Sequence, residues 1–229
     1  MSSYRSLPRV FIAGATAEAP FELPQEELDK LRKVLRLSSG AELGVLPNDG
    51  TMIRCELQGR EAIPLEVTTP STEPALRLTL AQALPKGDKL DDIVKACTGL
   101  GVARFVLFPS ERTVVQWDAK KMSHRLLRLQ TIAREEAEVC FRTRLPEFET
   151  AKNLAEVLQR YPEATVLSEV EGVARRLEPP VSTIVVGPEG GWSRKELDLI
   201  GSRGVTIGPR VLRVEHAAAA AAALVLLHT

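Results

Sequence analysis

Two stretches in the second half of the chain each pass from a short apolar strand through Gly-Pro and a turn into a helix. The first is VVGPEGGWSRKE, at residues 185–196, and the second is TIGPRVLRVEHAAAAAAALVLL, at residues 206–227. Other apolar runs of strand length precede them, with helical segments between most of them: LRLTLAQAL, ARFVLFP and ATVLSE. Alternating strands and helices predict an α/β domain whose sheet is parallel, or mostly so, and covered on both faces.

Both Gly-Pro breaks stand at the carboxyl end of an apolar run, and so does Leu167-Ser168-Glu169. In open α/β sheets, ligands bind in the crevice beyond the carboxyl ends of the strands. GPEGG lacks the G-K-[ST] and G-x-G-x-x-G signatures, so a nucleotide polyphosphate is a poor candidate. Glycine permits close approach and Pro188 stiffens the turn. A rigid rim of backbone donors and acceptors of this kind suits an adenine edge or an amino-acid headgroup.

The same loop also has a purely structural interpretation, as the entry to a helix. Ser193 is placed as the N-cap, and Glu196 closes a capping box. This interpretation explains those two residues and leaves Glu189 and Gly190-Gly191 without a reason. A ligand site and a simple helix entry are therefore open alternatives for the loop taken alone.

The two longest helical patterns carry small or apolar side chains. Seven consecutive alanines, residues 217–223, follow His216 in the last helix. Alanine is the best helix former, so a plain helix is the simple interpretation, although small side chains also let another backbone pack very close. A second helix is predicted near residues 122–140, with one apolar stripe: Met122, Leu126, Leu129, Ala133, Ala137 and Cys140.

The first seventy or so residues are mostly β in pattern. A short strand at residues 10–12 is followed by a hairpin at residues 42–59, whose turn is PNDG, and by a strand at residues 63–67. Several short strands in so little chain suggest a small barrel, closed to remove its edges. The linker-like TTPSTEP predicts a boundary between a domain of residues 1–72 and one of residues 73–229.

A helix with a basic cluster is predicted at residues 24–37, PQEELDKLRKVLRL. Four apolar residues fall at helical spacing: Leu28, Leu31, Val34 and Leu35. Four cations lie beside them: Lys30, Arg32, Lys33 and Arg36. The cations are either a solvated helix face or a phosphate-contacting patch on an otherwise neutral protein.

Composition excludes several classes of protein. Hydrophobic residues make up 44% and charged residues 26% of the chain, as in an ordinary soluble globular protein. Lys+Arg and Asp+Glu both total 30, which argues against a chain wrapped in nucleic acid by bulk charge but permits a local basic patch. Three cysteines far apart predict a reduced, cytoplasmic setting without a disulfide frame or metal site. We find no signal-peptide pattern, and the apolar run at residues 217–227 is too short for a membrane span.

Several motifs together resemble a known family over essentially the whole chain: VVGPEGGWSRKEL, TIGPRVLRVEHAAAAAAAL, LAQALPKGDKLDDIVKACTGLGV, PSERTVV and IAREEAEVCFRTRLPE. The family is the bacterial 16S ribosomal-RNA uridine-N3 methyltransferases of the RsmE type, in the SPOUT superfamily. RVFI and LRKVLRL look like the family's N-terminal RNA-binding barrel, which is PUA-like. The resemblance implies a homodimer and a C-terminal trefoil knot, a rare exception to unthreaded chains. The alanine helix is then the threaded tail, packed at the dimer interface.

The resemblance also implies S-adenosylmethionine as cofactor, held in a bent shape by backbone contacts of the glycine-rich loops. By matching positions the cofactor site comprises Leu167, Ser168, Glu169, Gly187, Pro188, Glu189, Gly190, Gly191, Ile207, Gly208 and Leu212.

The implied reaction methylates N3 of a uridine in the decoding region of 16S rRNA, with the small ribosomal subunit as substrate. Uridine N3 carries a proton at neutral pH, so the site needs a base or a group that stabilises the uridine anion. We assign Arg213 to the anionic base or a phosphate, and Glu215 to proton removal or to orienting Arg213, with Glu189 as the alternative base. His216 stands where the family has threonine, and we expect it to be a bystander.

Two single residues and one motif depart from the family pattern. A carboxylate is lost at Gly99, a glutamine amide is lost at Val139, and RTETA becomes RVEHA at residues 213–217. These changes concern the region expected to face RNA, where we predict contacts from the cluster at residues 30–36 and from Arg134, Arg142 and Arg144. Two alternatives follow: a non-catalytic RNA-binding relative, or a SPOUT methyltransferase acting on another RNA.

Overall fold

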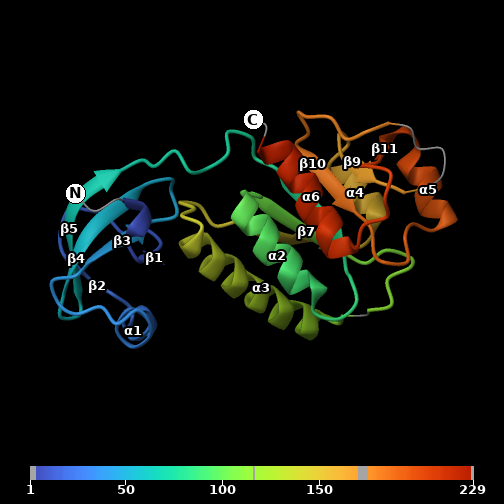
Figure 1. The fold of residues 1–229 in the computed structure, drawn as a ribbon. Helices are drawn as coiled ribbons and strands as arrows, with labels where there is room; N and C mark the ends of the chain where they lie inside the picture. The colour runs from blue at the N-terminus through green and yellow to red at the C-terminus, as the bar shows by residue number, and fades with distance from the viewer. Residues whose placement is uncertain (1–3, 116, 170–174, 228–229) are drawn as a thin grey trace. The chain divides into compact units, whose positions relative to one another are not determined.

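The computed structural model describes residues 4–115, 117–169 and 175–227. The chain forms two compact units, which we describe separately (Figure 1). The first contains Met1–Glu73 and Arg134–Leu145, and the second contains Pro74–Ala133 and Pro146–Thr229. The division into domains of residues 1–72 and 73–229 stays a proposal, and residues 134–145 group with the first unit.

The first unit is built on a curled sheet of five strands, with the order β1-β3-β4-β5-β2. The strands are β1 (Arg9–Phe11), β2 (Phe21–Glu22), β3 (Glu42–Leu46), β4 (Met52–Gln58) and β5 (Glu61–Thr68). Strands β3 and β4 form the predicted antiparallel hairpin. Within the described residues, β1 and β2 lie at opposite edges without pairing, so the sheet is a half-barrel rather than the closed barrel expected. Edge strands of three and two residues offer too few backbone groups to close the ring.

The predicted basic helix is a short α-helix, α1 (Gln25–Asp29), followed by a π turn, η2 (Lys30–Val34). Leu28 and Leu31 are buried in the core of the first unit, as their spacing suggested. The amide of Leu35 donates to the carbonyl of Lys30, 3.0 Å away, and this wider turn rotates the following residues away from the core. Val34 is therefore 71% exposed and Leu35 42% exposed, which the helical spacing did not predict.

The second unit contains a six-stranded sheet in which every pairing is parallel, with the order β11-β9-β10-β6-β7-β8. Its strands are β6 (Thr79–Ala83), β7 (Arg104–Phe108), β8 (Glu147–Thr150), β9 (Thr165–Leu167), β10 (Thr183–Val186) and β11 (Gly204–Val205). The predicted parallel sheet is confirmed. Strand β8 was not predicted, because EFET alternates apolar and acidic residues over only four positions.

Helices cover both faces of this sheet (Figure 1). They are α2 (Lys89–Leu100), α3 (Ala119–Val139), α4 (Leu154–Arg160), α5 (Arg194–Ile200) and α6 (Val214–Leu226). One core lies between the sheet and helices α2, α3 and α6, and a second core includes α4 and α5. Buried alanines of α6, such as Ala218 and Ala221, face the first core and let α6 pack closely against α2.

The stripe predicted for α3 is buried at its centre. Leu129, Ala133 and Ala137 are each almost fully buried, and Met122 and Leu126 are partly buried against the core. Cys140 is exposed, because α3 ends at Val139 and the chain turns away before the stripe is complete. No described helix has both the length and the apolar character that a membrane span requires.

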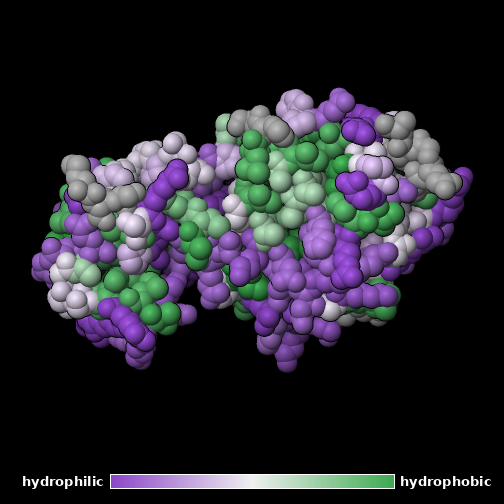
Figure 2. Space-filling view, in the orientation of Figure 1, coloured by the Kyte–Doolittle hydropathy of each residue, from purple (hydrophilic) through white to green (hydrophobic). Residues whose placement is uncertain are grey.

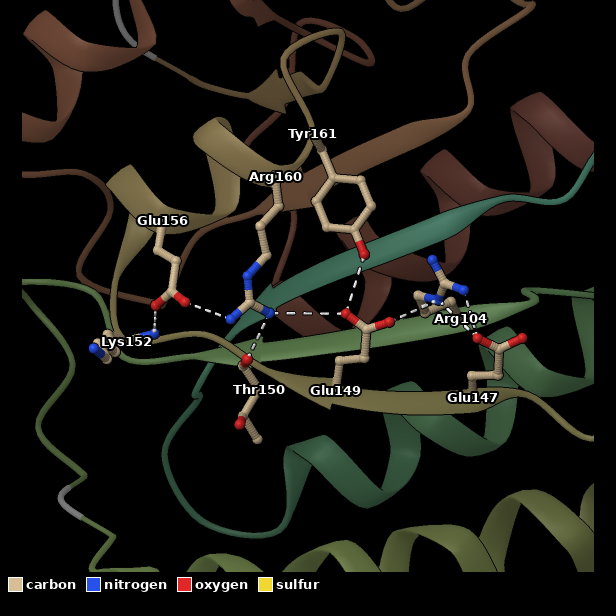
Figure 3. A network of polar contacts seen from close by, with 8 residues as sticks. All are labelled: Arg104, Glu147, Glu149, Thr150, Lys152, Glu156, Arg160 and Tyr161. Atoms are coloured by element: carbon tan, nitrogen blue, oxygen red, sulfur yellow. Dashed lines mark hydrogen bonds and ion pairs between the residues drawn. The ribbon is translucent and has the colours of Figure 1, made fainter.

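A polar network joins β8 to its neighbours (Figure 3). Arg104 of β7 donates from Nε to Glu147, at 3.0 Å, and forms an ion pair with Glu149, at 3.1 Å. The Tyr161 hydroxyl donates to Glu149 at 3.3 Å, and Arg160 donates to the Thr150 carbonyl at 2.9 Å. The network therefore ties the edge strand both to β7 and to the end of α4.

Candidate active site

A cavity of about 380 Å³ opens beyond the carboxyl ends of β9, β10 and β11. Its wall is formed by Arg112, Leu167, Ser168, Glu169, Val186, Gly187, Pro188, Glu189, Gly191, Trp192, Leu197, Val205, Thr206, Ile207, Val211, Leu212, Val214 and Ala217. The structure thus brings together all the predicted cofactor residues except Gly190 and Gly208. The volume is within the usual range for small-molecule sites, about 300–1,000 Å³.

The first glycine loop, residues 187–191, enters α5 through the predicted capping box. The Ser193 hydroxyl accepts from the Glu196 amide at 3.1 Å, and the Glu196 carboxylate accepts from the Ser193 amide at 2.9 Å. The amide of Gly191 closes the turn onto the Pro188 carbonyl at 2.9 Å, with φ at +67° for Gly191. This backbone conformation favours glycine. The interpretation as a helix entry is confirmed, and the loop also forms part of the cavity wall, whereas the ligand site stays a prediction.

Trp192 fixes the inner side of this loop, which the sequence analysis did not predict. Its indole Nε1 donates to the Leu167 carbonyl at 2.8 Å, and its ring stacks on Phe108 with centroids 6.5 Å apart. A Cβ on Gly187 would lie 3.0 Å from the indole ring. The glycine therefore lets the loop cross a buried aromatic ring that itself anchors the end of β9.

Arg112 fixes the outer side of the same loop. Its Nη1 donates to the Gly190 carbonyl at 2.8 Å. A Cβ added to Gly190 would meet the Cβ of Arg112 at 3.3 Å, so this glycine makes room for Arg112. Arg112 comes from PSERTVV, whose family resemblance was the only signal for it in the sequence.

The second glycine loop, residues 207–212, has fewer attachments. The Thr206 hydroxyl donates to the Gly208 carbonyl at 2.7 Å, and the Leu212 amide donates to the Glu169 carboxylate at 3.2 Å. Val211 is 83% exposed although its side chain contributes to the cavity wall. Arg213 is exposed at the N-cap position of α6.

Glu189 and Glu215, the two predicted bases, lie on either side of Lys89. The Lys89 Nζ is 2.8 Å from a Glu189 oxygen and 4.0 Å from Oε2 of Glu215. Burial raises the pKa of Glu189, but hydrogen bonds from Lys89 and from the Lys86 amide outweigh it, so the pKa lies below its usual value. Glu189 is therefore a stable carboxylate at neutral pH, which does not favour it as a proton acceptor.

Among the described residues, the carboxylate of Glu215 has fewer hydrogen-bond donors around it than the carboxylate of Glu189. Its side chain is 17% exposed, and Oε2 is buried without a hydrogen-bond partner among the described residues. Its backbone belongs to the first turn of α6, where the helix dipole favours a carboxylate. Among the described residues, Oε2 of Glu215 thus has Lys89 as a distant ionic neighbour but no hydrogen-bond donor, whereas Glu189 accepts from both Lys89 and the Lys86 amide.

Several cations that the sequence suggested for RNA binding are already paired within the first unit. Lys30 forms an ion pair with Glu138, and Arg134 forms one with Glu27. Arg142 is only 3% exposed, and its guanidinium binds the Glu73 carboxylate at 2.8 Å. Arg144 is exposed and donates to the Asp49 carbonyl.

The remaining cations of the basic cluster are exposed. Lys33, with its side chain 73% exposed, pairs with Asp29 one turn earlier at 2.9 Å. Arg32 donates to the Gly59 carbonyl, and Arg36 follows the π turn with φ at +56°. Beyond the cluster, the two departures from the family pattern, Gly99 and Val139, are also exposed.

Comparison with known proteins decides the family. Residues 72–226 match the family described as RNA methyltransferase domain. Ribosomal RNA small subunit methyltransferase E of Bacillus subtilis is 32% identical in an alignment of length 223 that covers 87% of each chain. The chain belongs to the RsmE-type 16S rRNA methyltransferases. A Synechocystis protein of the same name is 32% identical over 86% of this chain and 69% of its own.

Solved structures agree with this RsmE-type fold. Ribosomal RNA small subunit methyltransferase E of Neisseria gonorrhoeae, bound to S-adenosylmethionine, has a TM-score of 0.86 at 27% identity, covering 95% of this chain and 96% of its own. A Legionella pneumophila methyltransferase in complex with the same cofactor has a TM-score of 0.87 at 25% identity, covering 97% and 98%. The predicted SPOUT domain is confirmed, and the unit before it is a curled half-barrel sheet rather than the closed β-barrel expected.

Proposed function

We propose that this RsmE-type chain transfers a methyl group from S-adenosylmethionine to N3 of a uridine in the decoding region of 16S rRNA, in the assembled small subunit. One observation carries the proposal: the two glycine loops meet at one cavity beyond the strand ends, and half of its lining residues match the family's cofactor site. The cytoplasm is the proposed location, because the small subunit is found there.

The cavity residues fit S-adenosylmethionine better than a phosphate ligand. Leu167, Ile207 and Leu212 give apolar walls that suit a flat adenine ring. Among the described residues, the lining has two carboxylates, Glu169 and Glu189, and one cationic side chain, Arg112, which is already bonded to the loop. This charge balance favours a cationic ligand. When bound, the cofactor would supply an electrophilic methyl group on a positively charged sulfur.

The residues of this chain would prepare the uridine for methylation. We assign Glu215 to removal of the N3 proton, or to orienting Arg213, because it has a carboxylate oxygen without a donor whereas Glu189 is held by Lys89. Arg213, exposed beside it at the start of α6, would bind the uracil anion or a phosphate. His216 stays a proposed bystander.

Single-turnover methylation of small subunits at saturating cofactor tests these roles. Glu215→Gln should slow the chemical step about 100-fold, the usual size of a lost general base, and Arg213→Ala should slow it similarly. Affinity for S-adenosylhomocysteine should stay within about threefold in both variants. His216→Thr is the matched control and should react at the normal rate. If Glu189→Gln is slow and Glu215→Gln is not, the two roles are reversed.

The identity of the product separates this proposal from its alternatives. Digestion of rRNA from a deletion strain, followed by mass spectrometry, should show one missing N3-methyluridine in 16S rRNA. Loss of a methyl group from another RNA would favour a different SPOUT substrate. Unchanged methylation would favour a non-catalytic RNA-binding relative, to which the departures at Gly99 and Val139 lend some support.

The exposed part of the basic cluster is the proposed RNA contact on the first unit. Lys33 and Arg36 are exposed next to the apolar Val34 and Leu35. Lys30, Arg134 and Arg142 are paired with acids, so we place them as supports for this surface. Replacing Lys33 and Arg36 by glutamate should weaken subunit binding and reduce its salt dependence by about two phosphate contacts. Arg60→Glu, also exposed on this unit, is the control.

A homodimer is also proposed, from the family resemblance. Hydrophobic side chains gather over α6 on the face shown in Figure 2. Leu224 of α6 and Leu227, directly after it, are exposed, at 36% and 68%. Light scattering after size exclusion should give twice the chain mass, and Leu224→Glu with Leu227→Glu should reduce it to one chain mass.

A further inference from the structure

Lys89, at the start of α2, contacts two carboxylates from distant parts of the sequence. Glu189 belongs to the first glycine loop and Glu215 to the first turn of α6, at 2.8 Å and 4.0 Å from the Lys89 ammonium. The Lys86 amide adds a 3.1 Å bond to the Glu189 oxygen that Lys89 also binds. One ammonium therefore joins the wall of the cavity to the segment that carries the proposed reacting groups.

These three charges do not balance. Two carboxylates share one ammonium, and Oε2 of Glu215 has no donor among the described residues. Glu189 lines the cavity, so the net charge of the group acts on whatever the cavity binds. With Lys89 the group carries one negative charge, and without Lys89 it would carry two.

We propose that Lys89 is a positioning residue that holds the first glycine loop to the start of α6 and limits the negative charge at the cavity rim. The inference rests on the proposed function, because the methyl donor is a sulfonium cation and its demethylated product is a neutral thioether. A more negative rim attracts the cation and leaves the thioether nearly unaffected. Lys89 therefore sets how strongly the cavity discriminates between the two forms of the cofactor.

If Lys89 formed only an ordinary surface ion pair, its removal would have a different effect on the two cofactor affinities. The Lys89 side chain is 35% exposed, and pairs of this kind contribute little to stability. In that case its removal would change the affinities for the two cofactor forms equally or not at all. The ratio of the two affinities is thus the property that only a charge-setting role changes.

Calorimetric titration of purified protein with S-adenosylmethionine and S-adenosylhomocysteine measures this ratio. Lys89→Met should raise the preference for S-adenosylmethionine about fivefold, the effect expected of one unit charge in partly screened surroundings. Glu189→Gln should lower the preference by a similar factor. The double variant restores one net negative charge and should return to the wild-type ratio, and Lys89→Arg should keep it. Lys95→Met, the same change at an exposed site on α2, is the control.

The outcomes separate this inference from the proposed function. A ratio that is equal in the wild type, Lys89→Met and Glu189→Gln overturns the role of Lys89 and leaves the proposed function standing. A wild-type protein that binds neither ligand overturns both. Circular dichroism would show whether Lys89→Met folds. If it does not, the other two variants decide the question. A lowered preference for S-adenosylmethionine in Glu189→Gln, together with an unchanged preference in Lys89→Arg, supports the proposal.

Discussion

The two glycine loops share a Gly-Pro motif but are held in different ways. The loop at residues 187–191 is fixed on several sides: by Trp192 within, by Arg112 outside, by the capping box of α5 and by Lys89. The loop at residues 207–212 is fixed by Thr206 and Glu169, and Val211 is largely in solvent. A shared Gly-Pro motif therefore predicts where a loop lies, and the long-range contacts determine how rigid it is.

This difference suggests that the two loops have different roles when the cavity binds a ligand. A preorganised wall loses little conformational entropy when a ligand binds, whereas a loosely held wall can close over the ligand. We expect changes in the first loop to cost both stability and affinity, and changes in the second loop to cost little stability. Three substitutions and a change of pH test this contrast.

Gly187→Ala should have the largest effect. The new Cβ would lie 3.0 Å from the Trp192 ring, which is buried and hydrogen-bonded and so has little room to move. Overpacking of this kind costs about 1–3 kcal/mol of unfolding free energy, measured by urea denaturation, and should weaken S-adenosylhomocysteine binding. Gly204→Ala is the control, because its Cβ would meet its nearest atom at 3.5 Å, an ordinary contact. Equal effects of the two substitutions would contradict the prediction.

Trp192→Phe should come next. The change keeps the aromatic ring but removes the indole donor, so the Leu167 carbonyl loses a 2.8 Å bond. An unsatisfied buried acceptor costs about 1–3 kcal/mol, and we expect a value near the lower end because a phenyl ring leaves some room for water. Thermal denaturation checks this, with Trp117→Phe as the control. A stability equal to that of the wild type would show that the bond does not anchor the loop.

Acid should weaken the attachment of the first loop at Lys89. Burial raises the pKa of Glu189, but its hydrogen bonds keep the pKa below the usual 4.5. A lowered folded-state pKa adds stability above the unfolded value, and this is lost as pH falls through the folded value. The stability difference between wild type and Glu189→Gln, under about 1 kcal/mol for a partly exposed pair, should be constant near neutral pH. It should shrink below about pH 4.5; a difference that grows in acid would have the wrong sign.

Glu169→Ala should have the smallest effect on stability. Its carboxylate accepts from the Leu212 amide at 3.2 Å, but the residue is exposed and water can replace the bond. We expect a loss below about 0.5 kcal/mol in urea denaturation, the usual size for a solvent-exposed contact. A loss as large as that of Gly187→Ala would mean that the second loop is as firmly held as the first.

Local signals in the sequence predicted much of this site. The capping box of Ser193 and Glu196 needs only four neighbouring residues, and the Gly-Pro loops follow directly from the apolar strands before them. The family resemblance added the identity of the ligand. The threaded tail that it implies stays a prediction, because no periodicity of residues encodes how a chain passes through a loop.

Pairing between distant residues could not be predicted in the same way. Lys89 and Glu189 are 100 positions apart, and Arg142 and Glu73 are 69 apart, so nothing near either partner indicates the contact. The same limit applies to the basic cluster. Its sequence pattern did not distinguish Lys30, which forms an ion pair with Glu138, from Lys33, which stays exposed. The π turn could not be predicted from the sequence either, because a helical pattern assumes a constant number of residues per turn.

The polar network around β8 has a consequence for the behaviour of the protein at high concentration. Strand β8 is an edge of the six-stranded sheet, and an edge strand presents free backbone groups that can recruit another chain. Two copies meeting there would bring the carboxylates Glu147 and Glu149 of one against those of the other. We therefore expect the charged side chains of this edge strand to disfavour edge-to-edge aggregation.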